Sequence, residues 1–442
     1  MIYYDFAWYG ERIVPVPFIS VVISTLLAFF YLMIRHFVEK TPIKITKEFR
    51  VILIFFPVLQ LSILGLYFNG PTDEKLTQFF KTDAHLLFYI VFVFVIIQLF
   101  NKSSLQKFLK FYYVCGILIA CFGILQFIHL NLINISGMDQ MLFGTTKLYG
   151  KGPTRVASIF SEPSWFSYYL IDWIGIGLVH SLIRGWRKEL IAVILLLLAL
   201  FFSASLGGYV GLSLFIFLVL YQFPQIRLKL CVITIIILIS IITWKFSSLF
   251  FIESMGSRII DVIAGNDPSM QMRLDSAQAA LHVWLRNPII GVGIGNASFY
   301  TPEFYKAAWL YFTKDALFHI ACDNALLTIL AENGLIGFIA FIMMILAIIR
   351  QPRPGGFLNS ILYKKSVVKE TDINSSNQII LIYEKIFRII VMVSFIQLSF
   401  SGAFLYPRLW FIIGVYLALK EAVREKSIDS PSPLFSEIHG SR

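Results

Sequence analysis

The chain has 442 residues, of which 58% are hydrophobic and only 14% are charged, with a formal net charge of +11. Soluble domains are about one quarter charged, so this composition excludes an ordinary soluble protein and indicates a multi-pass membrane protein. The basic residues are spread over many segments and form no basic domain. The net charge therefore indicates membrane topology and contact with anionic lipid, and no nucleic acid is expected as a partner.

Apolar runs of about 20 residues, the length that crosses a bilayer, recur along the whole chain. The run at 189–222 is too long for one span. Its small, polar centre at 203–208 predicts two short helices joined by a tight turn, for which glycine supplies the backbone geometry. We therefore expect an all-α fold of eleven membrane-spanning helices, at 18–38, 51–68, 86–100, 111–133, 163–183, 189–205, 207–222, 230–251, 324–349, 386–403 and 406–420.

The distribution of Lys and Arg over the connecting segments predicts how these helices are oriented. One set of segments carries 22 of these residues and the opposite set carries 12. Since the richer set is expected in the cytoplasm, the C-terminus is predicted to lie inside and the N-terminus outside.

The sequence predicts one polytopic membrane domain over residues 1–426, followed by a disordered cytoplasmic tail at 427–442. Two longer polar segments, 134–162 and 252–323, fall on the predicted outer side and form the candidate site. A polar linker at 351–385 falls on the inner side. The cysteines and histidines show no metal-ligand spacing, so we expect neither a metal nor a cofactor.

The first outer segment ends in Ser161-Glu-Pro-Ser-Trp-Phe166 and contains Arg155. Pro163 suits the first position of a helix, and Glu162 before it is driven toward extended geometry. The free N–H groups at such a helix start favour an anion, and the guanidinium of Arg155 can grip a phosphate with two hydrogen bonds. The simpler interpretation is a helix cap beside an arginine that snorkels at a helix end.

The second outer segment predicts a helix that begins after Asp267 and ends near Arg286. Arg273 and Trp284 are about three turns apart, so they share one face of this helix. Another face is apolar at helical spacing and comprises Leu274, Ala277, Leu281 and Leu285. The glycines at 291–295 have the wrong spacing for a dinucleotide-binding motif and predict a close-packed turn. The simpler interpretation of Arg273 is a solvated position.

Acidic residues also occur where helices are predicted to enter or cross the membrane. Asp323-Asn324 precedes the span at 324–349, and the carboxylate could serve chemistry or simply cap the helix. Glu332 is a functional candidate, because an ionisable residue inside a membrane is costly. Asp172, about two turns into the helix that starts at Pro163, is a candidate to pair with an arginine.

At these residues the chain resembles the O-antigen polymerase and O-antigen ligase family of bacterial envelope glycosyltransferases. The resemblance covers nearly the whole chain and rests on Arg155 with 161–166, on 273–295, and on 323–337, in that order. Family members often carry an arginine within the split hairpin, where this chain has Ser205-Leu206-Gly207. Ligases typically place a histidine where this chain has Asp323, which favours a polymerase and argues against histidine-based catalysis.

The resemblance implies transfer of a glycan from undecaprenyl pyrophosphate to a sugar hydroxyl at the outer face of the bacterial cytoplasmic (inner) membrane. Arginines can stabilise the leaving pyrophosphate without a metal, and a carboxylate can orient or deprotonate the acceptor hydroxyl. The residues assigned to pyrophosphate binding are Arg155, Arg273 and Arg258. The catalytic candidates are Asp323 and, in reserve, Glu162, and the substrate-binding candidates are Asn324, Trp284 and Trp165. Expected partners are the undecaprenyl-pyrophosphate-linked oligosaccharide, the lipid bilayer, a chain-length regulator and a flippase.

Three alternatives stay open beside the polymerase. A ligase would transfer the glycan to lipid A-core rather than to another lipid-linked repeat unit. A transporter or flippase of lipid-linked saccharide predicts ionisable residues deep in several spans and a central polar path. The predicted spans are poor in charge while the outer segments are rich in Arg and Trp, which favours an enzyme. The paired outer arginines argue against a purely structural assembly protein.

Overall fold

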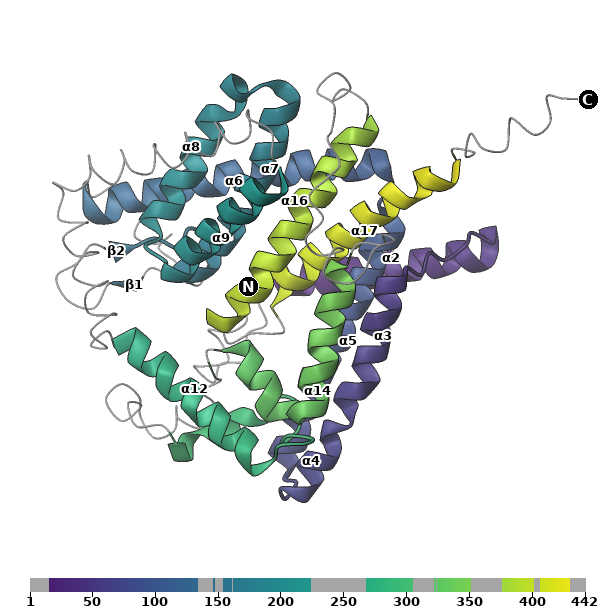
Figure 1. Ribbon diagram of the computed structural model, residues 1–442, viewed down its shortest axis with the longest axis vertical. Coiled ribbons are helices and arrows are strands. Elements are labelled where there is room, and N and C mark those ends of the chain that lie inside the picture. Colours follow the sequence, from purple (N-terminus) through teal and green to yellow (C-terminus); the bar gives the residue numbers. More distant parts are fainter. Residues whose placement is uncertain are drawn as a thin grey trace, which may run out of the picture.

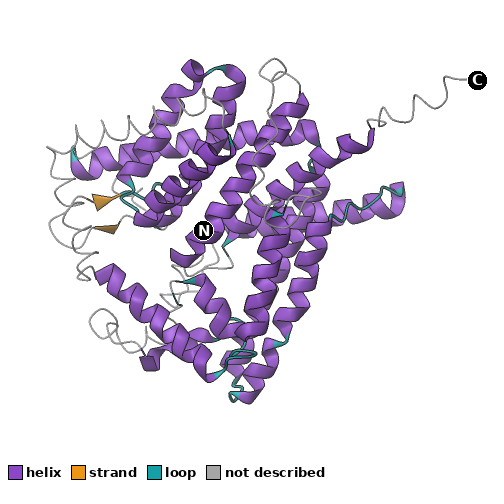
Figure 2. Cartoon of the chain, in the orientation of Figure 1, coloured by secondary structure: helices purple, strands orange, loops and turns teal. Residues whose placement is uncertain are grey.

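The chain folds into a bundle of helices of unequal length (Figure 1). The computed structural model describes residues 16–133, 146–147, 154–160, 162–223, 268–304, 322, 324–350, 376–400 and 406–429. Within these residues, every element except one short antiparallel strand pair is helical (Figure 2). The strands are β1 (Thr146–Lys147) and β2 (Thr154–Arg155). The predicted all-α class is therefore confirmed for the described part of the chain.

The α-helices are, in chain order, α2 (Val16–Glu39), α3 (Lys47–Gln60), α4 (Ser62–Phe68), α5 (Asp73–Leu99), α6 (Lys102–Asn131), α7 (Pro163–Arg184), α8 (Trp186–Phe202), α9 (Leu206–Gln222), α12 (Pro268–Arg286), α14 (Ala325–Ile349), α16 (Ser376–Gln397) and α17 (Pro407–Asp429). Three short 3₁₀ helices are η2 (Ala297–Phe299), η3 (Thr301–Phe304) and η6 (Leu398–Phe400).

The predicted count of eleven spans is not confirmed. Six helical stretches of the described chain are long and apolar enough to cross a membrane, and they are α2, α3 with α4, α5, α6, α7 and α14. Helices α8 and α9 are apolar but shorter. The predicted spans 386–403 and 406–420 fall on α16 and α17, and the one at 230–251 lies outside the described residues.

Several predicted boundaries are wrong because capped polar turns precede the apolar runs. The side chain of Thr72 caps α5, and a reciprocal capping box between Asn101 and Ser104 starts α6. Both helices therefore begin well before the runs predicted at 86–100 and 111–133. Helix α16 starts inside the predicted linker at 351–385, and α17 continues to Asp429, past the predicted start of the tail.

The split of the 189–222 run into two helices is confirmed, but the prediction that glycine makes the turn is wrong. The residue with positive φ is Ala204, at 45°, in the short turn between α8 and α9. Gly207 and Gly208 lie inside α9 instead. A Cβ on Gly207 would lie 2.7 Å from the Tyr168 hydroxyl, and one on Gly208 would lie 2.5 Å from the Ser167 side chain. These glycines let α9 approach α7 closely.

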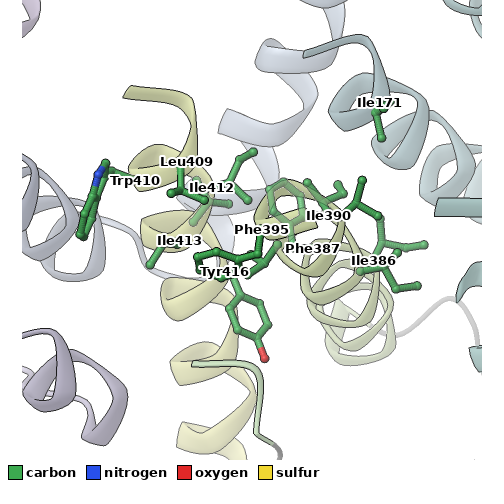
Figure 3. Close-up of a cluster of buried hydrophobic side chains, with 14 of the residues drawn as sticks. Ile171, Ile386, Phe387, Ile390, Phe395, Leu409, Trp410, Ile412, Ile413 and Tyr416 are labelled. Atoms are coloured by element: carbon green, nitrogen blue, oxygen red, sulfur yellow. The ribbon is translucent and has the colours of Figure 1, made fainter. Parts of the chain in front are cut away.

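The core of the bundle is built around α7, α16 and α17. Helices α16 and α17 pack against each other, and α7 packs against α16, α8 and α9. Figure 3 shows side chains of α16 and α17 in one cluster, with Ile386 and Ile390 on the side of α16 that faces away from Tyr416. These two isoleucines lie near Gly175 of α7 instead. Residues of α7 are buried almost continuously from Phe166 to Ser181, so this helix is surrounded by protein rather than lipid.

Two groups of helix ends can be distinguished by their contacts. At one end, Glu48 of α3 pairs with Arg424 and Lys420 of α17, and Lys420 also donates to the Arg350 carbonyl. The Gln98 side chain there bonds the backbone of Lys44. Lys44, Glu48, Arg350 and Arg424 come from segments predicted to lie in the cytoplasm, and Gln98 and Lys420 come from the adjoining ends of predicted spans. At the opposite end lie the starts of α5, α7, α9 and α17.

The bundle interior holds more charge than the sequence predicted. Asp172 and Arg408 are 0% and 2% exposed, and Glu384 and Arg388 of α16 are equally buried. The statement that the spans are poor in charge is therefore wrong for α16 and α17. Long helices that are covered by protein can hold ionisable groups that lipid-facing ones cannot.

Candidate active site

Arg155 lies at the α8–α9 turn. Its strand β2 pairs with β1, and the Asn131 side chain at the end of α6 bonds both backbone groups of Thr154. The half-buried Arg155 donates from Nε to the Ser203 carbonyl at 3.2 Å, beside a backbone bond from Val156 to Phe202. The turn at 203–205 contains no arginine of its own, yet the guanidinium of Arg155 lies against it.

The segment between Arg155 and α7 is held firmly in place. The Gln126 side chain exchanges two hydrogen bonds with the backbone of Ser158, both at 2.8 Å. The Phe160 ring packs on Phe166 and Tyr169 at centroid distances of 5.6 and 4.9 Å. Arg155 and the start of α7 are therefore presented by one packed unit.

Glu162 lies at the N-cap of α7 and is exposed. Its carboxylate does not cap the backbone; it accepts hydrogen bonds from Ser164 Oγ at 2.8 Å and from Trp165 Nε1 at 3.2 Å. The predicted helix start at Pro163 is confirmed, whereas the simple cap interpretation of the Glu162 side chain is not. Two of the predicted site residues, Glu162 and Trp165, thus lie together.

Aromatic rings that the sequence analysis missed surround Trp165. Tyr406 meets the Trp165 ring edge-on at 3.9 Å between centroids, and Tyr169 meets Tyr406 at 6.2 Å. The available signal was Tyr406-Pro407-Arg408, which repeats the proline-started helix of Glu162-Pro163. Together Trp165, Tyr168, Tyr169 and Tyr406 form a packed aromatic cluster, which we call the aromatic mouth. Tyr168 and Tyr406 are buried in it, and Trp165 and Tyr169 are half-buried.

Below the aromatic mouth, Asp172 and Arg408 form a two-pronged ion pair. Arg408 donates from Nε to Asp172 Oδ2 at 2.8 Å and from Nη2 to Oδ1 at 2.6 Å. Its third nitrogen, Nη1, donates to Gln397 Oε1 at 3.2 Å, and the guanidinium lies 5.8 Å from the Tyr168 and Tyr169 rings. The expectation that Asp172 pairs with an arginine is confirmed.

Helix α12 has the predicted bounds but packs through a different face. Leu274, Leu281 and Leu285 are exposed, whereas Ser276, Ala279, Ala280 and Val283 are buried. Small side chains face the protein because α12 packs closely on α14. Arg273 is half-buried at the side of this contact, and Trp284 Nε1 donates to the Pro288 carbonyl at 3.1 Å. In this structure Trp284 fixes the end of its own helix.

The glycine turn at 291–295 fills a break in α14, as the prediction of a close-packed turn implied. Gly334 has φ 61° and ψ −165° and bends the helix, as Figure 1 shows. The carbonyls of Ala331 and Glu332 accept the N–H groups of Val292 and Gly293 at 3.0 and 2.9 Å. Backbone groups freed by a break in a membrane helix need such partners. The buried Glu332 carboxylate accepts the N–H of Ala297 at 3.4 Å, so it anchors this turn.

Asn324 is the N-cap of α14 and accepts the N–H of Leu327 at 3.1 Å. Asp323 and Arg258 lie outside the described residues, so their roles stay predictions. Arg155, Glu162 and Trp165 belong to the α7–α9 region, whereas Arg273, Trp284 and Asn324 belong to α12 and α14. Helix α14 contacts α16 and η6, which lead to Gln397 beneath the aromatic mouth. Within the described residues, no three His, Cys, Asp or Glu side chains could hold a metal ion.

Residues 191–342 match a family model described as O-antigen ligase. No curated protein sequence matches the chain. The matched region includes Arg273, Trp284 and Asn324 and ends before Arg408. The match covers 152 of the 442 residues, and together with the apolar helices of the fold it supports the predicted resemblance to the O-antigen polymerase and ligase family.

Proposed function

We propose that the chain polymerises undecaprenyl-pyrophosphate-linked oligosaccharide repeat units at the outer face of the bacterial cytoplasmic membrane. The family match supports a glycosyltransferase-like enzyme. The observation that carries the proposal is that one packed segment holds Arg155 at the α8–α9 turn and Glu162, with the aromatic mouth, at the start of α7. A cation, an exposed carboxylate and aromatic rings are what a pyrophosphate-linked sugar requires.

The main requirement of this reaction is to stabilise the negative charge of the leaving group. When the glycosidic bond to the donor breaks, negative charge develops on the leaving pyrophosphate, and preorganised guanidinium groups stabilise it. In the proposal Arg155 is one of these groups, and its Nε bond to the Ser203 carbonyl holds it at the α8–α9 turn. In the proposal Arg273 and Arg258 complete the pyrophosphate site.

The acceptor hydroxyl must lose a proton as the new bond forms, so a nearby base assists. Asp323 is the proposed base, adjacent to the cap residue Asn324, and Glu162 is the reserve. Glu162 is exposed and can accept a further donor besides Ser164 and Trp165, because a carboxylate offers about four acceptor positions. The Trp165 indole would then contact the sugar ring, with Asn324 and Trp284 as the other substrate contacts.

Polymerase is preferred over ligase because Asp323 stands where ligases typically have a histidine. The buried charges of α16 and α17 favour one alternative, a transporter of lipid-linked saccharide, since transporters place ionisable groups in their spans. Lipopolysaccharide banding of a deletion strain separates the three. Loss of the polymerase leaves one repeat on the core, loss of a ligase leaves none, and loss of a flippase leaves unextended intermediates inside the cell.

A further inference from the structure

The Asp172–Arg408 pair joins two helices that are far apart in sequence. Asp172 lies inside α7, and Arg408 is the second residue of α17. Both partners are buried, at 0% and 2% exposure. A buried charge is costly to place unless its partner geometry is good, and here both carboxylate oxygens are engaged at 2.6 and 2.8 Å. The pair therefore specifies one position of α17 relative to α7.

A third contact brings in the end of α16. Arg408 Nη1 donates to Gln397 Oε1 at 3.2 Å, and Gln397 is the last residue of α16. One guanidinium thus joins the interior of α7, the end of α16 and the start of α17.

A short chain of contacts leads from this pair to the proposed site. Tyr406 precedes Arg408 by two residues, and its carbonyl accepts the N–H of Leu409 at 3.0 Å. Its ring meets Trp165 edge-on at 3.9 Å, and Trp165 in turn donates to Glu162. A shift of the first turn of α17 would therefore move Tyr406, then Trp165, then the Glu162 carboxylate.

We propose that Asp172 and Arg408 are positioning residues for the site, setting the Trp165–Glu162 unit through Tyr406. Arg408 is buried and each of its three guanidinium nitrogens donates to a protein oxygen, so it acts through its neighbours rather than on substrate. Small displacements of a catalytic group lower reaction rates strongly. A buried ion pair that fixes the position of the Glu162 carboxylate relative to a sugar hydroxyl would therefore increase the rate. The effect on activity rests on the proposed function, whereas the effect on Trp165 does not.

The chain supplies a matched control at its opposite end. Glu48 accepts two hydrogen bonds from Arg424, at 2.9 and 2.6 Å, and forms an ion pair with Lys420. Glu48→Gln and Asp172→Asn therefore remove the same kind of buried carboxylate charge. Only Asp172→Asn should change the surroundings of the Trp165 side chain.

The test is ¹⁹F NMR of the full chain labelled with 5-fluorotryptophan in nanodiscs, with the Trp165 resonance assigned by its loss in Trp165→Phe. We expect Asp172→Asn and Arg408→Lys to shift or split this resonance and Glu48→Gln to leave it unchanged. If Asp172→Asn fails to accumulate, Gln397→Leu removes only the third contact of Arg408 and should give a smaller shift. An unchanged Trp165 resonance in folded Arg408→Lys protein, or an equal shift in Glu48→Gln, overturns the inference.

Complementation of a deletion strain supplies the second readout. The readout is the ladder of gel bands formed by polysaccharide chains of increasing length. At matched protein level and thermal stability, Asp172→Asn should lower the amount of polysaccharide in this ladder about tenfold relative to Glu48→Gln. Equal ladders in these two variants would also overturn the positioning role, provided that Glu162→Gln lowers the ladder. If Glu162→Gln and Trp165→Phe keep full ladders while the Trp165 resonance shifts as expected, the positioning inference is supported and the proposed function of the mouth fails.

Discussion

At the scale of single residues, Arg155 is proposed to bind the donor pyrophosphate. Its contact with the Ser203 carbonyl uses Nε, a group that lysine lacks. Arg155→Lys keeps the charge but loses the planar fork, so ladder formation should fall strongly. Arg155→Ala removes charge-assisted hydrogen bonds of roughly 1.5–3 kcal/mol and should lower activity about ten- to hundredfold. Quantified ladders from equal amounts of protein check both, and a full ladder in Arg155→Ala would remove the residue from the site.

The two carboxylate candidates can be separated by isosteric substitution. Asp323→Asn keeps a helix-start residue of equal capping strength, so a purely structural Asp323 predicts an unchanged ladder. The catalytic role predicts a strong loss. Glu162→Gln keeps an acceptor for Ser164 and Trp165 and tests the reserve base in the same assay. A full ladder in Asp323→Asn together with loss of the ladder in Glu162→Gln would assign the role of base to Glu162 at the start of α7.

At the scale of elements, the glycine turn packed into the bend of α14 is the most constrained feature of the described chain. A Cβ on Gly291 would overlap the backbone of Glu332, and Gly291 also has φ 70°. Gly291→Ala should therefore lower the stability by more than about 2 kcal/mol. Gly70→Ala is the matched control, because Gly70 has φ 75° but nothing within 4 Å of the added Cβ. Thermal unfolding in detergent measures both, and equal midpoints would contradict the packing argument.

Which elements were predictable depended on how local their causes were. The start of α7 and the course of α12 follow from proline and cap signals that lie within a few residues of each helix end. The buried face of α12 did not follow, because its small residues pack on α14 and apolar spacing alone pointed to the leucines. The Arg155–Ser203 contact and the Tyr406–Trp165 contact join segments about 48 and 241 residues apart, and no local pattern encodes such distances.

At the scale of the whole molecule, the helix ends fall into two sets, one around Glu48 and one around the aromatic mouth. The uneven distribution of Lys and Arg over the connecting segments predicts that the first set lies inside and the second outside. Ser269 on α12 is predicted to lie outside, and the exposed Ser103 at the start of α6 is predicted to lie inside. Cysteine variants at these positions, in a background without the native cysteines, should react with a membrane-impermeant reagent at 269 only. Reaction at 103 alone would reverse the orientation.

The most direct test of the central claim is reconstitution. The purified full chain in liposomes would receive undecaprenyl-pyrophosphate-linked repeat units and no lipid A-core. A polymerase needs only the lipid-linked unit as donor and acceptor, so we predict longer lipid-linked glycans and an equivalent release of undecaprenyl pyrophosphate. Unextended units that are consumed only after lipid A-core is added, or that cross the bilayer without a new glycosidic bond, would contradict the account.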